Sequence, residues 1–316
     1  MTPDDLFSDA AISEETRAVN AAVIAAAGQL PDWWDIGAPA FRALRAAGGA
    51  PFPPLARSAR AHDLTIAGPG GPLGLRVIPA NPAHGVFLHV HGGGWVLGAV
   101  DQQDALLERL SDATGLTVVS VDYRLAPEHP FPAGPDDCEV AALWLAHHAV
   151  EALGAPLKAI GGESAGAHLA ALTLIRLRDR HGLTPFRCAN LAFGCYDLQL
   201  TPSARVFGEA RLVLRTSDMR AFIDAFAPVP LDRSDAEISP LFADLSGLCP
   251  ALFTVGTRDA LLDDTLFMQA RWRAAGNAAE LAIAPGGSHG FVAFPSGLAT
   301  TALGRMFAFL AETSRD

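Results

Sequence analysis

The chain has 316 residues, half of them hydrophobic, and a formal net charge of −11 at pH 7. Its only lysine is Lys158 and no Lys/Arg cluster occurs, which argues against nucleic acid or an anionic membrane as a partner. No basic leader precedes the first helix and no C-x-x-C pair occurs, so we expect a reduced, cytoplasmic protein without disulfides or zinc; the cysteines are Cys138, Cys188, Cys195 and Cys249.

Residues 1 to about 50 are predicted to be helical. Ala10–Ala27 is rich in alanine, and Ala38–Ala47 places apolar residues at helical spacing. Pro31-Asp32-Trp33-Trp34 is expected to separate these two helices. Pro51-Phe52-Pro53-Pro54 should end the segment, because proline stops helices.

The remainder of the chain alternates apolar runs with helix-like stretches, after a hairpin formed by Asp63–Ala67, a turn at 68–72 and Leu73–Pro79. This alternation predicts one α/β domain with a mostly parallel sheet covered on both faces. Residues 201 to 244 interrupt the rhythm, and a lid would sit there. The expected strands are Val86–Val90, Leu116–Val121, Leu157–Gly161, Ala189–Gly194, Ala251–Val255 and Leu281–Ala284. The expected helices are Asp104–Ala113, Asp136–Ala149, Ala165–Arg178, Leu262–Ala275 and Leu298–Glu312.

A serine lies at a glycine-flanked turn, Gly162-Glu163-Ser164-Ala165-Gly166, between an expected strand and an expected helix. A serine hydroxyl becomes a nucleophile only when it is exposed, oriented and served by a base. The turn supplies exposure and orientation, and it needs small residues at Gly162 and Gly166 because the backbone is crowded there. Roughly one chain in eight of this composition would contain the pattern by chance, so its partners must decide its meaning.

Three glycines follow the strand Val86–Val90, in the segment His91-Gly92-Gly93-Gly94-Trp95. Attack on an ester carbonyl produces an oxyanion, which needs preorganised N–H donors. In hydrolases with a serine at such a turn, this loop and the residue after the nucleophile supply the donors. We therefore expect an oxyanion hole formed by the N–H groups of Gly92, Gly93 and Ala165.

An acid and a base follow the ends of later strands. Asp259 leaves the strand that ends near residue 255, and it is preferred over Asp263 and Asp264, which occupy a helix start where carboxylates act as caps. His289 follows the next strand in a glycine-rich loop and is the one histidine after the acid. The order serine, aspartate, histidine is that of α/β-hydrolases with this turn.

The other histidines do not point to catalysis or to a metal site. His89 and His91 form an H-x-H pair, but no carboxylate or third histidine has matching spacing, so no metal and no cofactor are expected. His168 comes one turn after the nucleophile and is expected to pack or to form a hydrogen bond rather than to catalyse.

From about residue 63 to its end, the chain resembles the hormone-sensitive-lipase-like family of α/β-hydrolases, in its bacterial family IV esterase branch. The resemblance implies an α/β-hydrolase fold of 1–316 with a mostly parallel central sheet, and a helical cap from about 1–50 and about 200–240. The resemblance also implies that His91, Gly94, Trp95 and Glu163 support the catalytic residues. Glu163 stands at a position where Asp is commoner in the family. The segments that carry it are His91–Trp95, Asp122–Ala133, the Ser164 turn, Asp259 and His289-Gly290-Phe291, with Asp197 and Ser239-Pro240-Leu241.

The resemblance implies a serine carboxylesterase that hydrolyses short- to medium-chain acyl esters through an acyl-enzyme. Ser164 would be the nucleophile, His289 the base and Asp259 its orienting acid. An amide or arylformamide hydrolase would use the same machinery and stays open. A ligand-binding receptor resembling the plant gibberellin receptors is the other alternative, but those receptors have lost the catalytic histidine that is present here. Family members often form homodimers through an edge strand and the last helix, and we extend that expectation to this chain.

Overall fold

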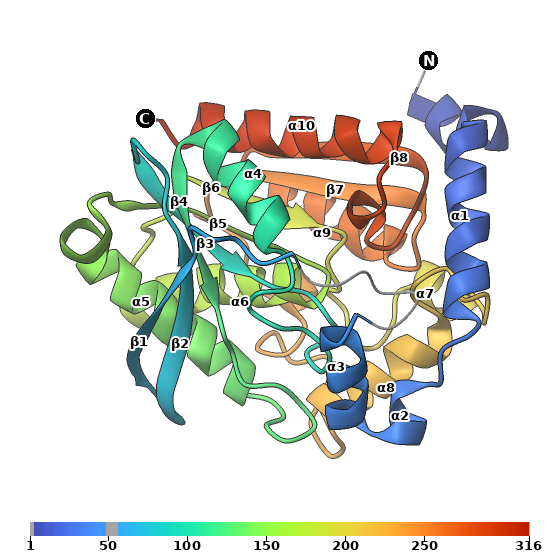
Figure 1. The fold of residues 1–316 in the computed structure, drawn as a ribbon, viewed down its shortest axis with the longest axis horizontal. Coiled ribbons are helices and arrows are strands. Elements are labelled where there is room, and N and C mark those ends of the chain that lie inside the picture. The colour runs from blue at the N-terminus through green and yellow to red at the C-terminus, as the bar shows by residue number, and fades with distance from the viewer. Residues whose placement is uncertain (1–2, 49–55, 316) are drawn as a thin grey trace.

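The computed structural model describes residues 3–48 and 56–315. Its centre is an eight-stranded sheet with the order β1-β2-β4-β3-β5-β6-β7-β8 (Figure 1). β2 runs antiparallel to β1 and β4, and the remaining neighbours are parallel, so the sheet is mostly parallel as predicted. The strands are β1 His62–Gly68, β2 Gly71–Ile78, β3 Gly85–Val90, β4 Leu116–Val121, β5 Leu157–Glu163, β6 Cys188–Ala192, β7 Ala251–Arg258 and β8 Ala279–Ser288.

Helices cover both faces of this sheet (Figure 1). α4 (Asp104–Thr114) and α10 (Gly297–Thr313) lie together on one face, while α5 (Ala133–Leu153), α6 (Ala165–His181) and α9 (Leu262–Ala274) cover the other. Both faces are therefore buried, which explains why every residue of β3 and β4 is buried and why these strands show no alternation of polar and apolar residues.

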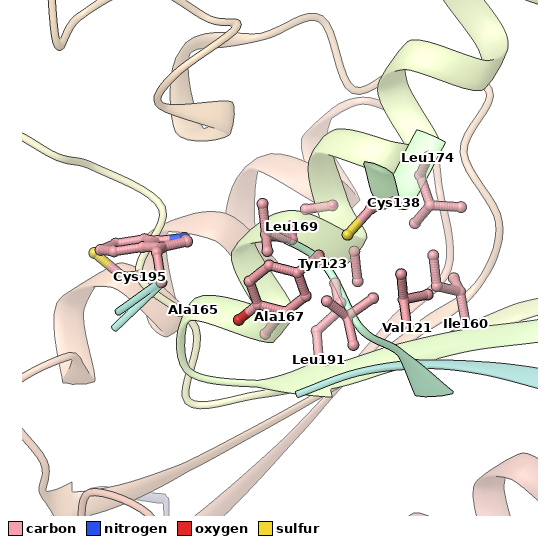
Figure 2. Close-up of a cluster of buried hydrophobic side chains, with 14 of the residues drawn as sticks. Val121, Tyr123, Cys138, Ile160, Ala165, Ala167, Leu169, Leu174, Leu191 and Cys195 are labelled. Atoms are coloured by element: carbon pink, nitrogen blue, oxygen red, sulfur yellow. The ribbon is translucent and has the colours of Figure 1, made fainter. Parts of the chain in front are cut away.

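The core has two clusters, one on each face of the sheet. The larger cluster joins α5, α6 and α9 to the sheet, and Figure 2 shows part of it, with Tyr123, Leu169 and Leu191 among the drawn side chains. The smaller cluster includes Phe87 and Phe309, which pack between the sheet and the helices α4 and α10. The strands that carry the candidate site are thus held by packing on both sides.

The N-terminal helices lie beside the helices inserted between β6 and β7 (Figure 1). Arg211 joins the two segments by donating to the carbonyl oxygens of Ala27 and Leu30 and to the Asp32 carboxylate. Arg215 binds the same carboxylate. The N-terminal helices are α1 Glu14–Ala27, α2 Trp33–Ile36 and α3 Ala38–Ala46, preceded by the 3₁₀ helices η1 Pro3–Phe7 and η2 Asp9–Ala11. The inserted helices are α7 Pro202–Val206 and α8 Thr216–Phe226; η3 Pro240–Phe242 and η4 Phe291–Ala293 are further 3₁₀ helices.

One local prediction is confirmed and another is wrong. The segment Pro31–Trp34 does separate the two predicted helices, since α1 ends at Ala27 and α3 begins at Ala38, and it contains the start of the short helix α2, in which Trp33 is buried and stacks on Phe222. The glycines expected in a loop before His289 belong to β8, which continues to Ser288 because Arg258 of β7 pairs with it there. The predicted stop at Pro51–Pro54 lies outside the described residues.

Candidate active site

Ser164 occupies the predicted turn between β5 and α6. Its backbone has φ 57° and ψ −121°, a conformation that costs a non-glycine residue about 1–3 kcal/mol and is kept only where the surroundings impose it. Here its N–H donates to the Ala192 carbonyl at 3.0 Å, and its carbonyl accepts from the His168 N–H at 3.2 Å. A Cβ atom on Gly162 would lie 2.7 Å from the carbonyl carbon of Gly166, which explains why small residues flank the serine.

The three predicted residues meet at the carboxyl ends of β5, β7 and β8. His289 Nε2 lies 2.8 Å from Ser164 Oγ, and His289 Nδ1 lies 3.0 Å from both carboxylate oxygens of Asp259. Asp259 is 3% exposed and His289 is 7% exposed. With its proton on Nδ1, a neutral His289 donates to Asp259 and presents the Nε2 lone pair to the serine hydroxyl. The arrangement can remove the serine proton and stabilise the resulting imidazolium.

The two rival carboxylates are committed elsewhere. Asp263 accepts from the backbone N–H of Ser203 at 2.8 Å. Asp264 accepts from the Tyr196 N–H and from the Thr201 hydroxyl, both at 2.6 Å, and burial raises its pKa to about 7. Both side chains fasten the segment after β6 to α9. Within the described chain, the carboxylate after β7 is the one that contacts the imidazole.

The glycine loop after β3 lies against the serine turn. A Cβ atom on Gly92 would lie 2.7 Å from the Glu163 carbonyl oxygen, so only glycine allows this close approach. Gly93 and Gly94 have φ values of 118° and 62°, which favour glycine. In the described part of the chain, the N–H groups of Gly92, Gly93 and Ala165 donate to no protein acceptor, so they are available to a ligand oxygen.

The segment after β4 braces the glycine loop. The Tyr123 hydroxyl donates to the His91 carbonyl at 2.9 Å, and the two rings stack with centroids 4.2 Å apart. The Ala126 N–H donates to the Trp95 carbonyl, also at 2.9 Å. Burial lowers the pKa of His91 to about 3, so its imidazole is neutral. These contacts fix both ends of the loop without entering the chemistry.

A chain of polar side chains, which the sequence did not predict, ends beside the nucleophile. His89 Nδ1 lies 2.8 Å from the Ser120 hydroxyl, and its Nε2 lies 3.1 Å from the Glu163 carboxylate. His89 and Ser120 are register partners on β3 and β4. Their signal was a polar residue inside each of two mostly apolar strands, and buried polar groups need partners.

Among residues 3–48 and 56–315, no three His, Cys, Asp or Glu side chains are grouped so that they could hold a metal ion. None of the helices in the same residues combines the length and the apolar character that crossing a bilayer requires.

Comparison with known proteins agrees with this geometry. A family model described as the alpha/beta hydrolase fold matches residues 87–293. Carboxylic ester hydrolase LipN of Mycobacterium tuberculosis is 36% identical over 241 residues, which are 73% of this chain and 64% of that protein, so the match spans less than two thirds of LipN. Ethyl acetate hydrolase of Pseudomonas putida is 35% identical over 214 residues, which cover 66% of this chain and 67% of that protein.

Solved structures give the same result over a longer stretch. An esterase of Pyrobaculum calidifontis is 30% identical with a TM-score of 0.83, covering 96% of this chain and 100% of that one. The thermostable carboxylesterase EstE1 from a metagenomic library is 30% identical with a TM-score of 0.78, and the match covers 98% of this chain and 100% of EstE1. The resemblance inferred from the motifs is thereby confirmed: the chain belongs to the hormone-sensitive-lipase-like family of α/β-hydrolases.

Proposed function

We propose that this protein is a carboxylic ester hydrolase in which Ser164 is the nucleophile, His289 the general base and acid, and Asp259 the residue that orients His289. One observation carries the proposal: a continuous hydrogen-bonded chain runs from the serine hydroxyl through the imidazole to a buried carboxylate. The curated relatives named above are ester hydrolases, which supports the same chemistry. Because all three residues of this hydrogen-bonded chain are present, the site argues against a receptor that only binds its ligand.

The reaction follows from the positions of these groups. His289 Nε2 takes the Ser164 proton as the oxygen attacks the ester carbonyl, and the carbonyl electrons move onto the oxygen. The N–H groups of Gly92, Gly93 and Ala165 hold this oxyanion. When the tetrahedral intermediate collapses, the bond to the alcohol breaks and the imidazolium returns its proton to the leaving alkoxide.

Deacylation repeats these steps with water. His289 takes a proton from water as the water oxygen attacks the acyl carbonyl, and the oxyanion occupies the same N–H groups. The bond to Ser164 then breaks, the imidazolium protonates the serine oxygen, and the carboxylic acid leaves.

A fluorophosphonate probe tests the assignment directly. We expect one covalent adduct per chain, located on Ser164 by mass spectrometry, and none in the Ser164→Ala variant. That variant should lose several orders of magnitude in hydrolysis of an aryl acetate while its circular dichroism spectrum is unchanged. Near-normal esterase activity in Ser164→Ala would refute the proposal. A matched ester and anilide pair would measure how strongly the site prefers esters to amides.

The proposed substrates are short- to medium-chain acyl esters of small or aromatic alcohols. The similar Pseudomonas putida and Salmonella proteins are named an ethyl acetate hydrolase and an acetyl esterase, which points to short acyl groups. A physical reason agrees. The Phe222 ring lies within 2.7 Å of where a Cβ on Gly94 would be, and it stacks on Trp33 at 5.5 Å, so aromatic rings fill space beside the glycine loop. A series of aryl esters from acetate to palmitate tests this, and preference for the longest chain would refute it.

The proposal also includes the surroundings of the site. Residues of about 1–50 and about 200–240 form a cap over the acyl pocket, supported by the contacts of Arg211 and Trp33 between the two segments. The net charge of −11 and the single lysine support a protein without a nucleic-acid or membrane partner, and we assign it to the cytoplasm. A homodimer through the edge strand β8 and α10 would be tested by light scattering.

A further inference from the structure

Trp95 has an unusual backbone for a large residue. Its φ is 60°, in the left-handed region that bulky side chains rarely adopt, and it directly follows Gly93 and Gly94, which also have positive φ. Such a conformation persists only when contacts impose it. The Trp95 carbonyl accepts from the Ala126 N–H at 2.9 Å, which is the first of these contacts.

The second contact is a buried hydrogen bond to the nucleophile helix. The Trp95 indole N–H donates to His168 Nδ1 at 3.1 Å, and His168 Nε2 lies 2.8 Å from the Ile238 carbonyl. Because a carbonyl can only accept, the His168 proton sits on Nε2 and the Nδ1 lone pair faces Trp95. Burial lowers the pKa of His168 to about 4, so the ring is neutral and both nitrogens are used.

The third contact comes from the inserted helix α8. Trp95 stacks on Phe226 with centroids 4.6 Å apart and planes at 17°, and Phe226 also meets the His168 ring edge-on at 5.6 Å. All three residues are at most 3% exposed. The His168 N–H is also bonded to the Ser164 carbonyl. One buried cluster therefore touches the serine turn, the glycine loop and α8.

We infer that His168 is a positioning residue, which through the Trp95 indole holds the glycine loop in register with Ser164. The inference rests on the proposed oxyanion role of Gly92 and Gly93. Those N–H groups and the serine oxygen belong to different segments of the chain, and the bond between Trp95 and His168 joins these two segments through side chains. Without it, the strained Trp95 backbone is free to relax, and the donors move away from the position of the oxyanion.

The consequence should fall on turnover rather than on substrate binding. Loss of one oxyanion donor costs about 10²- to 10³-fold in kcat, so partial misplacement of two donors should cost roughly 10- to 100-fold. The ester ground state makes weaker demands on these donors, so KM should change by less than about threefold.

The experiment compares four variants with the wild-type protein. His168→Leu removes both side-chain bonds, Trp95→Phe keeps a stacking ring but removes the indole N–H, and the double variant removes the whole link. Thr173→Val is the matched control on the same helix α6, because it deletes a buried hydroxyl that donates to the Leu169 carbonyl and takes no part in the bond between Trp95 and His168. Readouts are kcat and KM for an aryl butyrate, and the inhibition constant of a trifluoromethyl ketone, which forms a tetrahedral adduct with the serine.

Each single variant should lose roughly 10- to 100-fold in kcat and a similar factor in affinity for the ketone, and the double variant should lose no more than the worse single one. Thr173→Val should keep wild-type turnover. Full turnover in Trp95→Phe, or losses that multiply in the double variant, would overturn the inference. If His168→Leu fails to fold, Trp95→Phe alone decides. A wild-type protein without esterase activity would instead refute the proposed function.

Discussion

The active centre and the proposed cap are held together by different kinds of interaction. Ser164, Asp259 and His289 follow the parallel strands β5, β7 and β8 of one sheet, in which β6 lies between β5 and β7, so backbone ladders and close glycine contacts set their separation. The two cap segments meet through side chains, chiefly the Asp32 carboxylate and the stacking of Trp33 on the inserted helix α8. Substitutions in the centre should therefore change chemistry at constant specificity, and substitutions in the cap should change specificity and local stability.

The largest effect is expected from Asp259→Asn. An asparagine can present its amide N–H₂ to His289 Nδ1, which stabilises the tautomer with the proton on Nε2 and removes the base from the serine. We expect kcat to fall about 10³- to 10⁴-fold with an unchanged order of preference among acyl chains. Asp263→Asn is the control, since its carboxylate binds the Ser203 N–H away from the imidazole. A change in acyl preference in Asp259→Asn would contradict the separation of centre and cap.

The next effect is a pH dependence of stability carried by His168, which lies where centre and cap meet. Its pKa is lowered by burial from 6.5 to about 4, so it stays neutral in the folded protein while the unfolded chain takes up a proton below pH 6.5. Stability is thus fully present above pH 6.5 and falls as the pH drops toward 4. Between pH 7 and pH 5 this group should remove about 2 kcal/mol from the free energy of unfolding.

Urea unfolding at both pH values measures this loss. His91, with a pKa lowered to about 3, adds a decrease of the same sign in the wild-type protein and in the variant. The His168→Leu variant should therefore lose about 2 kcal/mol less than wild type between pH 7 and pH 5. Equal losses in both proteins would show that His168 does not stay neutral in the fold.

The sequence predicted the sheet and the meeting of the serine, aspartate and histidine because both depend on local patterns. The strand over residues 116–121 lies where its apolar run placed it, and the helix after the serine begins at Ala165 as expected. Contacts between distant segments were not predictable. Arg211 meets Asp32, and Trp95 meets His168, only once the fold brings them together, and neither pair has a spacing or composition that marks it.

Phe222→Ala tests the contrast between the active centre and the proposed cap. It should change the preference among acyl chains while leaving the chemistry intact. Removing a ring that packs against Gly94 and Trp33 opens space beside the glycine loop. The ratio of kcat/KM for an aryl octanoate to that for the acetate should rise about tenfold, within the range that filling an apolar pocket supplies. Phe222→Leu should give an intermediate ratio. A uniform loss on both esters would instead place Phe222 with the catalytic geometry.

The smallest effect concerns the joint between the two cap segments. Asp32→Asn keeps the size of the side chain but removes the charge that binds Arg211 at 2.7 Å and Arg215 at 2.5 Å. The loss is partial, because Arg211 keeps the backbone carbonyls near the end of α1 and Arg215 keeps the Asp218 carboxylate. We expect about 1 kcal/mol of destabilisation, which lowers Tm by roughly 2 °C in a chain of this size.

A looser joint should also raise KM a few fold at nearly constant kcat, since Asp32 touches none of the three residues that carry the chemistry. Asp35→Asn, on the short helix α2 that Asp32 precedes, is the matched control: it removes an exposed charge without an ion pair within the described residues. If both variants behave alike, the joint contributes only general surface charge. If Asp32→Asn lowers kcat as strongly as KM rises, the cap segments and the catalytic centre are coupled more tightly than their separate sets of contacts imply.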